Sequence, residues 1–344
     1  MLVSYFIDYF YPVQPPFFSV IIPVFNRPQE LEELLTSLVN QTIRDFNVLV
    51  VEDGSTLTSR HVYEKFTDRL PIEYFVKPNS GPGPSRNFGF ERASGRYLVV
   101  FDSDCILPSD YFQHVQEFMN HNPVDAWGGP DRGHEKFTPL QQAMAYTMSS
   151  VLTTGGIRGG KNQAERFQPR SFNMGVSRAV FEATGGFRFD RLAEDIEWSI
   201  RMRNAGFRVA LIPNAFVYHK RRATLTEFFR QVKGFGRGRV RVGRAHPGEV
   251  KITHWFPAVF TLALLILPVL WLLSYPLAAV GSMLVFVYLF AIAADAWRTT
   301  RSVTVAGLAV PSALTQLTGY GLGFLQEQLK PKGNLSGNNR LTIW

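Results

Sequence analysis

Short apolar runs alternate with helical patterns through the first third of the chain. Four runs have the continuous apolar character of buried parallel strands, and they cover residues 19–25, 46–51, 72–76 and 98–101. After the first run, Pro28 suits the opening turn of a helix whose leucines recur at helical spacing from Leu31 to Leu38. Strands that alternate with helices predict βαβ units. We therefore expect an α/β domain with a mostly parallel sheet and helices on both faces.

Shorter patterns continue this domain to about residue 250. They predict a strand and turn at 172–178, a helix that begins at Glu194 and ends at Gly206, and two strands at 207–212 and 215–218. A further helix begins near Thr224. We take residues 17–250 as one domain.

The pattern changes at residue 256. Residues 256–274 and 276–294 contain no Lys, Arg, Asp or Glu, and each stretch is long enough to cross a bilayer. They predict a membrane hairpin within a membrane region at 251–330. Residues 303–325 are also uncharged but include Pro311 and several polar residues, so we expect a re-entrant or interfacial segment there, with the tail 331–344 on the cytoplasmic side.

Residues 1–16 form a separate, aromatic arm. The arm carries Asp8 and lacks the basic start and uninterrupted apolar run of a signal peptide. Two interpretations remain open. The arm is either a short helix that lies on a membrane surface, with its rings at the interface, or a segment packed on the domain.

Charge is distributed unevenly. The sequence has 36 Lys and Arg against 28 Asp and Glu, a net charge of +8, and the excess is concentrated in residues 220–244, where Glu227 is the only acid. Such a run is typical of proteins that bind nucleic acid or anionic lipid headgroups. Because the run adjoins a membrane segment, we expect headgroup contact and no nucleic-acid partner. The positive-inside rule places the run, and hence the domain, on the cytoplasmic side of the inner membrane. The lone Cys105 excludes an internal disulfide.

Polar residues follow several of the predicted strands. The strand at 98–101 ends in Asp102 and Asp104, one residue apart, and Asn26-Arg27 and Asp53-Gly54-Ser55 follow two others. Ligands of α/β sheets lie outside the carboxyl ends of the strands, and paired carboxylates there suit a hard divalent cation. Each site alone also fits a capped turn. Their convergence predicts a pocket for a nucleotide diphosphate, although the chain has no dinucleotide-binding or P-loop glycine motif.

The segments 19–26, 50–55, 81–89 and 102–104, in this order and spacing, resemble the GT-A glycosyltransferases of family 2. Those enzymes invert the anomeric centre and use nucleotide-sugar donors. The resemblance covers roughly residues 17–245 and implies the Rossmann-like GT-A fold. It also implies a Mg²⁺ or Mn²⁺ cofactor held by Asp104, together with contacts to the nucleotide sugar from Pro23, Phe25, Arg27, Asp53, Arg86, Asp102 and Ser103. For Arg86, which the resemblance places near the diphosphate, the alternative is a solvated helix charge.

The resemblance also assigns the acid pair Glu194-Asp195. An inverting transfer needs a carboxylate to deprotonate the acceptor hydroxyl, and the resemblance gives that role to Asp195, supported by Glu194. The alternative is a pair of acids stabilised by a helix N-terminus. His219, at the end of a predicted strand, is either structural or, as in some relatives, completes the metal site or touches the diphosphate. In family members that extend polysaccharides the region after Gln231 carries an Arg-Trp pair, which is absent here, so we do not expect processive synthesis.

These expectations combine into one functional hypothesis. The chain moves a sugar from a UDP- or GDP-sugar to a hydroxyl of a lipid-linked or cell-envelope saccharide. Two alternatives remain open, namely transfer directly to polyprenyl phosphate and a non-catalytic membrane scaffold that binds nucleotide only.

Overall fold

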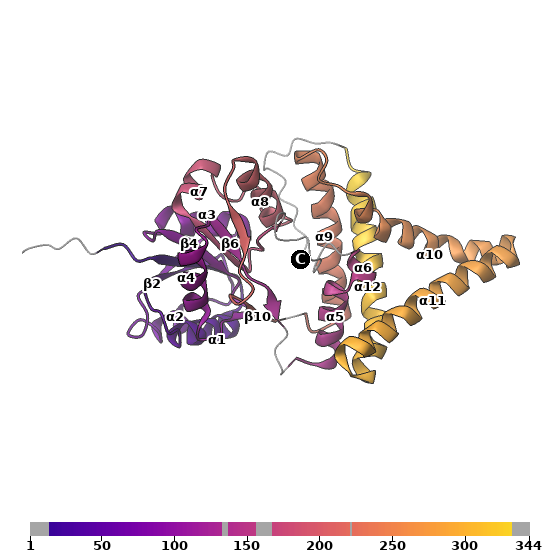
Figure 1. Cartoon of the computed structure of the whole chain (residues 1–344), viewed down its shortest axis with the longest axis horizontal. Coiled ribbons are helices and arrows are strands. Elements are labelled where there is room, and N and C mark those ends of the chain that lie inside the picture. The colour runs from indigo at the N-terminus through magenta and orange to yellow at the C-terminus, as the bar shows by residue number, and fades with distance from the viewer. Residues whose placement is uncertain (1–13, 133–136, 156–166, 221, 332–344) are drawn as a thin grey trace, which may run out of the picture.

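The computed structural model describes residues 14–132, 137–155, 167–220 and 222–331 (Figure 1). The predicted N-terminal arm and C-terminal tail therefore lie almost entirely outside the described residues. The described chain forms an α/β domain, a layer of helices beside it, and a helical hairpin that projects from that layer (Figure 1).

A seven-stranded sheet forms the centre of the α/β domain. Its order is β3-β2-β1-β4-β8-β6-β9, and β8 alone among these strands runs antiparallel to its neighbours. The four predicted strands occupy its first half. β1, β2 and β4 are buried, as continuous apolar runs require, whereas β3 is half-buried because it forms the edge of the sheet, and Val76 is exposed. The strands are β1 (Phe18–Val24), β2 (Phe46–Asp53), β3 (Ile72–Lys77), β4 (Tyr97–Phe101), β6 (Ala126–Gly128), β8 (Asn173–Ser177) and β9 (Val209–Leu211).

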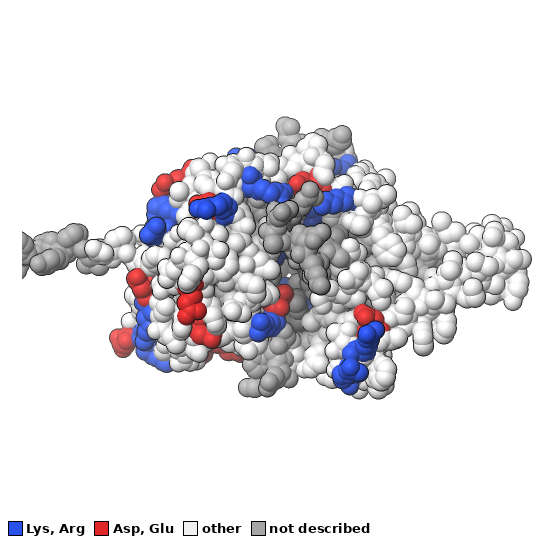
Figure 2. All heavy atoms as spheres, in the orientation of Figure 1, with Lys and Arg blue, Asp and Glu red and all other residues white. Residues whose placement is uncertain are grey.

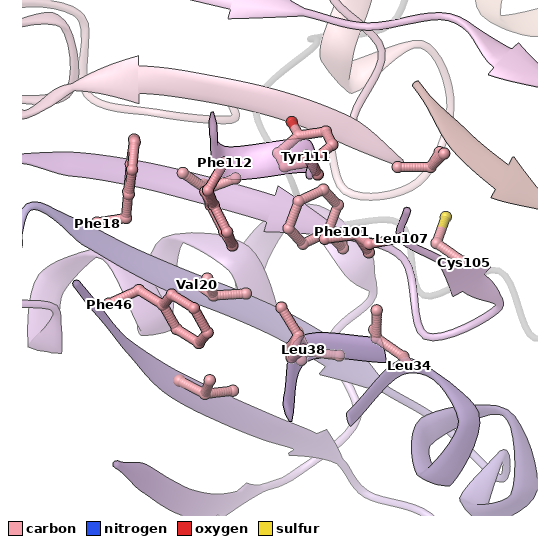
Figure 3. Close-up of a cluster of buried hydrophobic side chains, with 14 of the residues drawn as sticks. Phe18, Val20, Leu34, Leu38, Phe46, Phe101, Cys105, Leu107, Tyr111 and Phe112 are labelled. Atoms are coloured by element: carbon pink, nitrogen blue, oxygen red, sulfur yellow. The ribbon is translucent and has the colours of Figure 1, made fainter. Parts of the chain in front are cut away.

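Helices cover both faces of this sheet. Alternate residues of a strand point to opposite faces, so Val20 and Phe101 pack under α1 (Pro28–Val39), α2 (Arg60–Glu64) and α4 (Tyr111–His121). Figure 3 shows part of this cluster, with Phe18, Phe46 and Phe112 stacked along it. Ile21 points the other way, toward α3 (Pro82–Arg92), α7 (Arg178–Thr184) and α8 (Glu194–Asn204). The predicted α/β architecture is confirmed.

A second, three-stranded sheet lies beyond the end of β4. It consists of β5 (Cys105–Ile106), β10 (Val217–His219) and β7 (Asp131–Arg132), in the order β5-β10-β7. Strand β10 runs antiparallel to β5, and the register sets His219 opposite Cys105. This pairing brings His219 beside Asp104, although 115 positions separate them in the sequence.

The helical layer beside the domain is built around two long helices. Helix α9 (Leu225–Ala245) packs against α12 (Val303–Gln328) at very short range, because a Cβ atom on Gly236 would lie 2.1 Å from the Tyr320 carbonyl oxygen. Only glycine permits this approach. The remaining elements of this region are α5 (Pro139–Ser149), α6 (Val151–Thr154), η2 (Ile252–His254), α10 (Phe256–Leu273) and α11 (Tyr275–Thr300).

Helices α10 and α11 form the projecting hairpin. Within the described residues, two segments are long and apolar enough to cross a membrane, Ile252–Leu273 and Tyr275–Thr300, each with a mean hydropathy of 2.4. Their outer side chains are exposed and apolar. Figure 2 shows no Lys, Arg, Asp or Glu on the projecting part of the hairpin on the face in view, and charged residues only at its base. The two helices coincide with the predicted spans and are compatible with membrane segments.

Helix α12 contains the third apolar stretch, 303–325. It is one continuous helix despite Pro311, and it packs against α9, α5, α10 and α11. Contacts with three arginines of α9 hold its C-terminal end in place. Glu327 accepts from Arg237 at 3.1 Å and from Arg241 at 2.8 Å, and its backbone oxygen accepts from Arg244 at 2.7 Å. These three arginines of the basic run therefore bind α12, whereas we had expected them to face lipid headgroups. An interfacial position of α12 stays a prediction.

Candidate active site

A cleft of about 2770 Å³ separates the strand ends of the α/β domain from the helical layer. The strand ends form one wall, and α5, α9 and α12 contribute to the other. The parallel strands bring their carboxyl ends to one edge, which concentrates the polar residues that follow them. All the predicted site residues line this one cleft: Pro23, Phe25, Arg27, Asp53, Arg86, Asp102, Ser103, Asp104, Glu194, Asp195 and His219.

Asp104 and His219 form a candidate metal site. Asp104 Oδ1 lies 3.1 Å from His219 Nε2, and Asp104 Oδ2 accepts from Arg27 Nη1 at 2.5 Å. Burial raises the pKa of Asp104, but the His219 and Arg27 charges oppose it more strongly and hold that pKa well below its usual range. The carboxyl is therefore ionised, as a metal ligand must be.

Cys105 completes a group of three ligand atoms that lie within 4.8 Å of one another. Complete burial, reinforced by the Asp104 and Asp102 charges, raises the pKa of the Cys105 thiol. A protonated thiol is a poor ligand, so the group offers a carboxylate oxygen and an imidazole nitrogen. Carboxylate oxygen suits Mg²⁺ and Mn²⁺, and the residues present fit such an ion.

Arg86 lies at the centre of a buried ion-pair network. Its side chain is 3% exposed, and it donates to Asp102 Oδ1 at 2.6 Å and to Glu194 Oε1 at 2.8 Å. The guanidinium also lies over the Phe187 ring, 5.2 Å from its centre. The solvated helix charge that we considered as the alternative is wrong for Arg86. Instead, Arg86 joins the end of β4 to the start of α8, and its contact with a diphosphate stays a prediction.

Glu194 is the less exposed member of the Glu194-Asp195 pair. Burial raises its pKa to about 7, with Arg86 opposing the shift and the Asp195 charge adding to it. A buried carboxyl that both gains and loses a proton near neutrality is typical of functional sites. The ion pair with Arg86 fixes where this carboxyl points, so Glu194 can orient the first turn of α8.

Asp195 faces the cleft more openly. Its side chain is 14% exposed, and its Oδ2 accepts from the Ser171 backbone N–H at 3.4 Å and lies 3.8 Å from Arg170 Nη1. The turn before it is strained, because Ala193 has a φ of 59°, a left-handed conformation that non-glycine residues rarely adopt. Strain of this kind persists where the surroundings fix a functional group. Ser171 and Arg170 thus hold the Asp195 carboxylate at the cleft wall, and its role as the general base stays a prediction.

Asp53 binds the loop that precedes α3. Its carboxylate accepts from Lys77 Nζ at 2.6 Å and from the backbone N–H groups of Ser80 and Gly81, both at 2.9 Å. Gly81 has a φ of 100°, which favours glycine at this turn. Contact between Asp53 and a base or ribose stays a prediction. Lys77 was missed by the sequence analysis, although a lysine at the end of a predicted strand was a visible signal.

Two residues that line the cleft, Arg170 and Arg239, were also missed. Arg170 follows an irregular segment and carries no motif. Arg239 belongs to the basic run, yet it is spaced seven residues from Val232 and eleven from Phe228, on the buried stripe of α9. That spacing was the available signal.

Comparison with known proteins identifies the domain. The family model "Glycosyl transferase family 2" matches residues 19–185. An uncharacterised glycosyltransferase of Rickettsia bellii is 36% identical over 104 residues, which are 30% of this chain and 15% of that protein. The minor teichoic acid biosynthesis protein GgaB of Bacillus subtilis is 32% identical over 114 residues, 31% of this chain and 13% of GgaB. This chain thus matches only a small part of these two relatives.

The solved structures include one that resembles nearly the whole described fold. The mannosyltransferase PcManGT from Pyrobaculum calidifontis, in complex with GDP-Man and Mn²⁺, aligns with a TM-score of 0.62 at 19% identity and covers 89% of this chain and 88% of its own. At this identity the likeness concerns the fold. Together with the family model and the sheet described above, it shows that residues 19–185 form a glycosyltransferase family 2 domain within a GT-A fold.

Proposed function

We propose that this chain is a membrane-anchored inverting glycosyltransferase. It moves one sugar from a UDP- or GDP-sugar to a hydroxyl of a lipid-linked or cell-envelope saccharide. The observation that carries the proposal is the meeting of Asp104, His219 and Asp195 in one cleft, opposite the helices that lead to the apolar hairpin. The similarity to a teichoic acid biosynthesis protein supports an acceptor in the cell envelope.

The donor half of the cleft is suited to a nucleotide diphosphate. Asp104 and His219 would hold the Mg²⁺ or Mn²⁺ ion, which neutralises charge that develops on the leaving diphosphate. Arg27 now binds the same carboxylate, so donor entry must move Arg27 from Asp104 toward the phosphate oxygens. Pro23 and Phe25 line the wall beside the β1 end, where a nucleoside would lie.

Asp195 is the proposed general base. The acceptor oxygen forms a bond to the anomeric carbon on the face opposite the diphosphate, and the bond from that carbon to the diphosphate oxygen breaks. The hydroxyl proton passes to Asp195 as the new bond forms. Ser171 and Arg170 hold the Asp195 carboxylate, while Glu194, bound to Arg86, fixes the turn that carries it.

The hairpin supports a membrane position for this reaction. Helices α10 and α11 are exposed and apolar, and the basic run precedes α10. We therefore propose the cytoplasmic face of the inner membrane as the site of the reaction, with residues 251–330 as the membrane region. A lipid-borne acceptor reaches the cleft from that side.

A second candidate reaction is transfer directly to polyprenyl phosphate. One observation favours it, because the Arg170 guanidinium lies 3.8 Å from Asp195, where an anionic nucleophile would also need a cation. A phosphate oxygen is already deprotonated and needs no base. The two reactions therefore differ in how strongly they depend on Asp195.

A thermal-shift screen of UDP- and GDP-sugars, with and without Mn²⁺, tests the proposed function. We expect one nucleotide sugar to raise the melting temperature of the full chain only when Mn²⁺ is present, since preferential binding to the folded state stabilises it. Hydrolysis of that donor is then measured for the wild type and for Asp104→Ala. The absence of Mn²⁺-dependent stabilisation by any UDP- or GDP-sugar would contradict the proposal and support a non-catalytic scaffold.

A further inference from the structure

Arg239 is a buried cation on the membrane side of the cleft. It is 8% exposed and lines the cleft from α9. Its guanidinium hydrogen-bonds the Tyr320 side chain, and burial lowers its pKa, assisted by repulsion from Arg170. Across the described residues, no Asp or Glu forms an ion pair with Arg239. Burial of a guanidinium without a carboxylate partner is unfavourable, because the charge loses its hydration, so its presence needs a reason.

Arg170 extends the positive region toward Asp195. It lines the same cleft, repels Arg239, and lies 3.8 Å from the Asp195 carboxylate. Lys251 also lines this part of the cleft. The nearby acid, Glu249, is bound to Arg203 at 3.2 Å. Positive charge therefore exceeds negative charge between Asp195 and α9, which is the condition for binding an anion.

The packing of α9 explains how Arg239 reaches this position. A Cβ atom on Gly238 would lie 2.9 Å from the Ala193 Cβ, so α9 touches the strained turn that precedes Glu194. Arg239, the next residue, is thus held close to the start of α8 by backbone contact. Its position is set by two rigid helices rather than by a loop, as a precise binding site requires.

Apolar residues continue the cleft from Arg239 toward the hairpin. Phe256 and Pro257 line it at the start of α10, and Leu317 and Tyr320 line it from α12. A molecule in this half would therefore meet cations at one end and an apolar path to the hairpin at the other. Phosphate esters of long-chain lipids have this combination of an anionic head and an apolar tail.

We propose that Arg239 and Arg170 form a binding site for the phosphate or diphosphate of a lipid-borne acceptor, whose chain leaves the cleft along α10 and α12. The proposal rests on the proposed function for its biological role. Its chemistry covers both a polyprenyl monophosphate and the diphosphate that links a saccharide to its lipid. The donor diphosphate belongs to the other half of the cleft, beside Asp104.

The test uses the full chain in nanodiscs of neutral lipid, with farnesyl phosphate and farnesyl diphosphate as probes and farnesol as the uncharged analogue. We expect at least one phosphorylated probe to raise the melting temperature of the wild type, and farnesol to leave it unchanged. In Arg239→Met the apparent affinity for that probe falls at least tenfold, because one charge-assisted contact is lost. Arg239→Lys keeps the charge and retains part of the affinity.

The stability of the unliganded protein separates a binding role from a structural one. Removal of a costly buried charge raises the melting temperature of Arg239→Met above that of the wild type. If the Tyr320 contact instead makes Arg239 a packing residue, Arg239→Met melts lower and still binds the probe, which overturns the proposal. Arg170→Gln provides a second test of binding should Arg239→Met fail to fold.

Two controls show whether the probe binds at Arg239, at the membrane surface or at the donor diphosphate position. Arg298→Gln removes an exposed charge at the base of the hairpin, outside the cleft, and we expect unchanged probe affinity. Equal losses in Arg298→Gln and Arg239→Met would mean general attraction to the membrane surface and would contradict the site. Competition by UDP or GDP with Mn²⁺ would place the probe at the donor diphosphate position and would also contradict it.

Nucleotide-sugar binding, measured with the same variants, distinguishes failure of this proposal from failure of the proposed function. Arg239→Met keeps the Mn²⁺-dependent shift with the nucleotide sugar, because Asp104 and His219 are unchanged. A wild type that binds farnesyl phosphate through Arg239 but binds no nucleotide sugar would support the phosphate site and remove the transferase. The reverse result, donor binding without any response to either phosphorylated probe, would remove the site and leave the transferase.

Discussion

The two halves of the cleft differ in how their charges are compensated. On the donor side, Arg27 binds Asp104, Lys77 binds Asp53, and Arg86 binds two carboxylates, so each of these three cations has an acidic partner. On the membrane side, Arg239 hydrogen-bonds a phenol and faces another arginine. Both halves are lined by charged residues and contain ion pairs, but among the described residues no Asp or Glu forms an ion pair with Arg239.

This difference indicates what each half requires of its ligand. When a diphosphate enters the donor side, Arg27 must leave Asp104, and a cation that arrives with the diphosphate can take the place of Arg27 on that carboxylate. An anion that enters the membrane side displaces no carboxylate from Arg239 and relieves the repulsion between two guanidinium groups. The donor side therefore favours a metal–diphosphate complex, and the membrane side favours an anion without a metal.

The largest expected effect is loss of the metal ligand. Asp104→Ala removes the carboxylate that His219 and Arg27 share, and we expect metal-dependent donor turnover to fall by about 10³-fold, since a metal contributes several kcal/mol of charge stabilisation. Nucleoside diphosphate release with Mn²⁺ measures it. Asp110→Ala removes an acid outside the cleft and serves as the control. Similar turnover in the two variants would contradict the metal assignment.

The next effect concerns the base. Asp195→Asn keeps the size of the side chain but cannot take a proton, so transfer to a saccharide hydroxyl falls by about 10²–10⁴-fold. Donor binding is measured by the Mn²⁺-dependent thermal shift. We expect it to stay the same, because the Asp195 carboxylate contacts Ser171 and Arg170 and no described contact joins it to Asp104. Asp190→Asn, at an exposed position in the segment before α8, is the matched control.

A small loss of transfer activity in Asp195→Asn would change the comparison between the two halves of the cleft. If transfer falls less than tenfold, the nucleophile is already an anion, and the membrane side holds a polyprenyl phosphate as the direct acceptor. The phosphate site at Arg239 would then be part of the reaction centre.

The third effect is on stability. Arg86→Met leaves Asp102 and Glu194 without their shared cation, and breaking a buried ion pair in this way costs about 3–5 kcal/mol. Denaturant unfolding in detergent measures the loss. Arg92→Met, on the same helix and 40% exposed, is expected to change the free energy of unfolding by less than about 0.5 kcal/mol. Equal losses would mean that the Arg86 network is not a stabilising link between β4 and α8.

The sequence predicted the donor half far better than the membrane half. Continuous apolar runs locate β1 to β4, and parallel strands necessarily collect the residues that follow them at one edge, so the convergence of Asp53, Asp102 and Asp104 follows from local patterns. His219 is different, because its place beside Asp104 depends on the β10–β5 pairing, and only the family resemblance pointed to it.

The membrane half depends on contacts that no local pattern contains. The burial of Arg239 requires the close approach of α9 to α12 at Gly236 and to Ala193 at Gly238. The helical spacing of Arg239 from Phe228 and Val232 places it on the buried stripe of α9, but only the packing of that stripe shows that Arg239 lines the cleft, while Arg237, Arg241 and Arg244 bind the end of α12.

The smallest expected effect is a pH dependence of stability that belongs to Glu194. Its folded pKa is raised to about 7 from an ordinary value of 4.5, so the folded state binds this proton more tightly than the unfolded state. The stabilisation that this proton gives the folded state is therefore fully present below about pH 4.5 and is lost as the pH rises toward 7. Glu194→Gln cannot titrate, and its melting temperature should fall less than that of the wild type between these values.

Melting curves of both proteins at intervals between pH 4.5 and 7.5 measure the difference. Many groups titrate in this range, so the informative quantity is the wild type minus the variant at each pH, which cancels the contributions that they share. Glu182→Gln, on the nearby helix α7, controls for the loss of an exposed carboxyl. A wild-type minus Glu194→Gln difference that stays constant, or that grows in favour of the wild type as the pH rises, would mean that Arg86 keeps Glu194 ionised throughout. The donor side would then be compensated at every pH, and Asp195 would have a permanently charged neighbour.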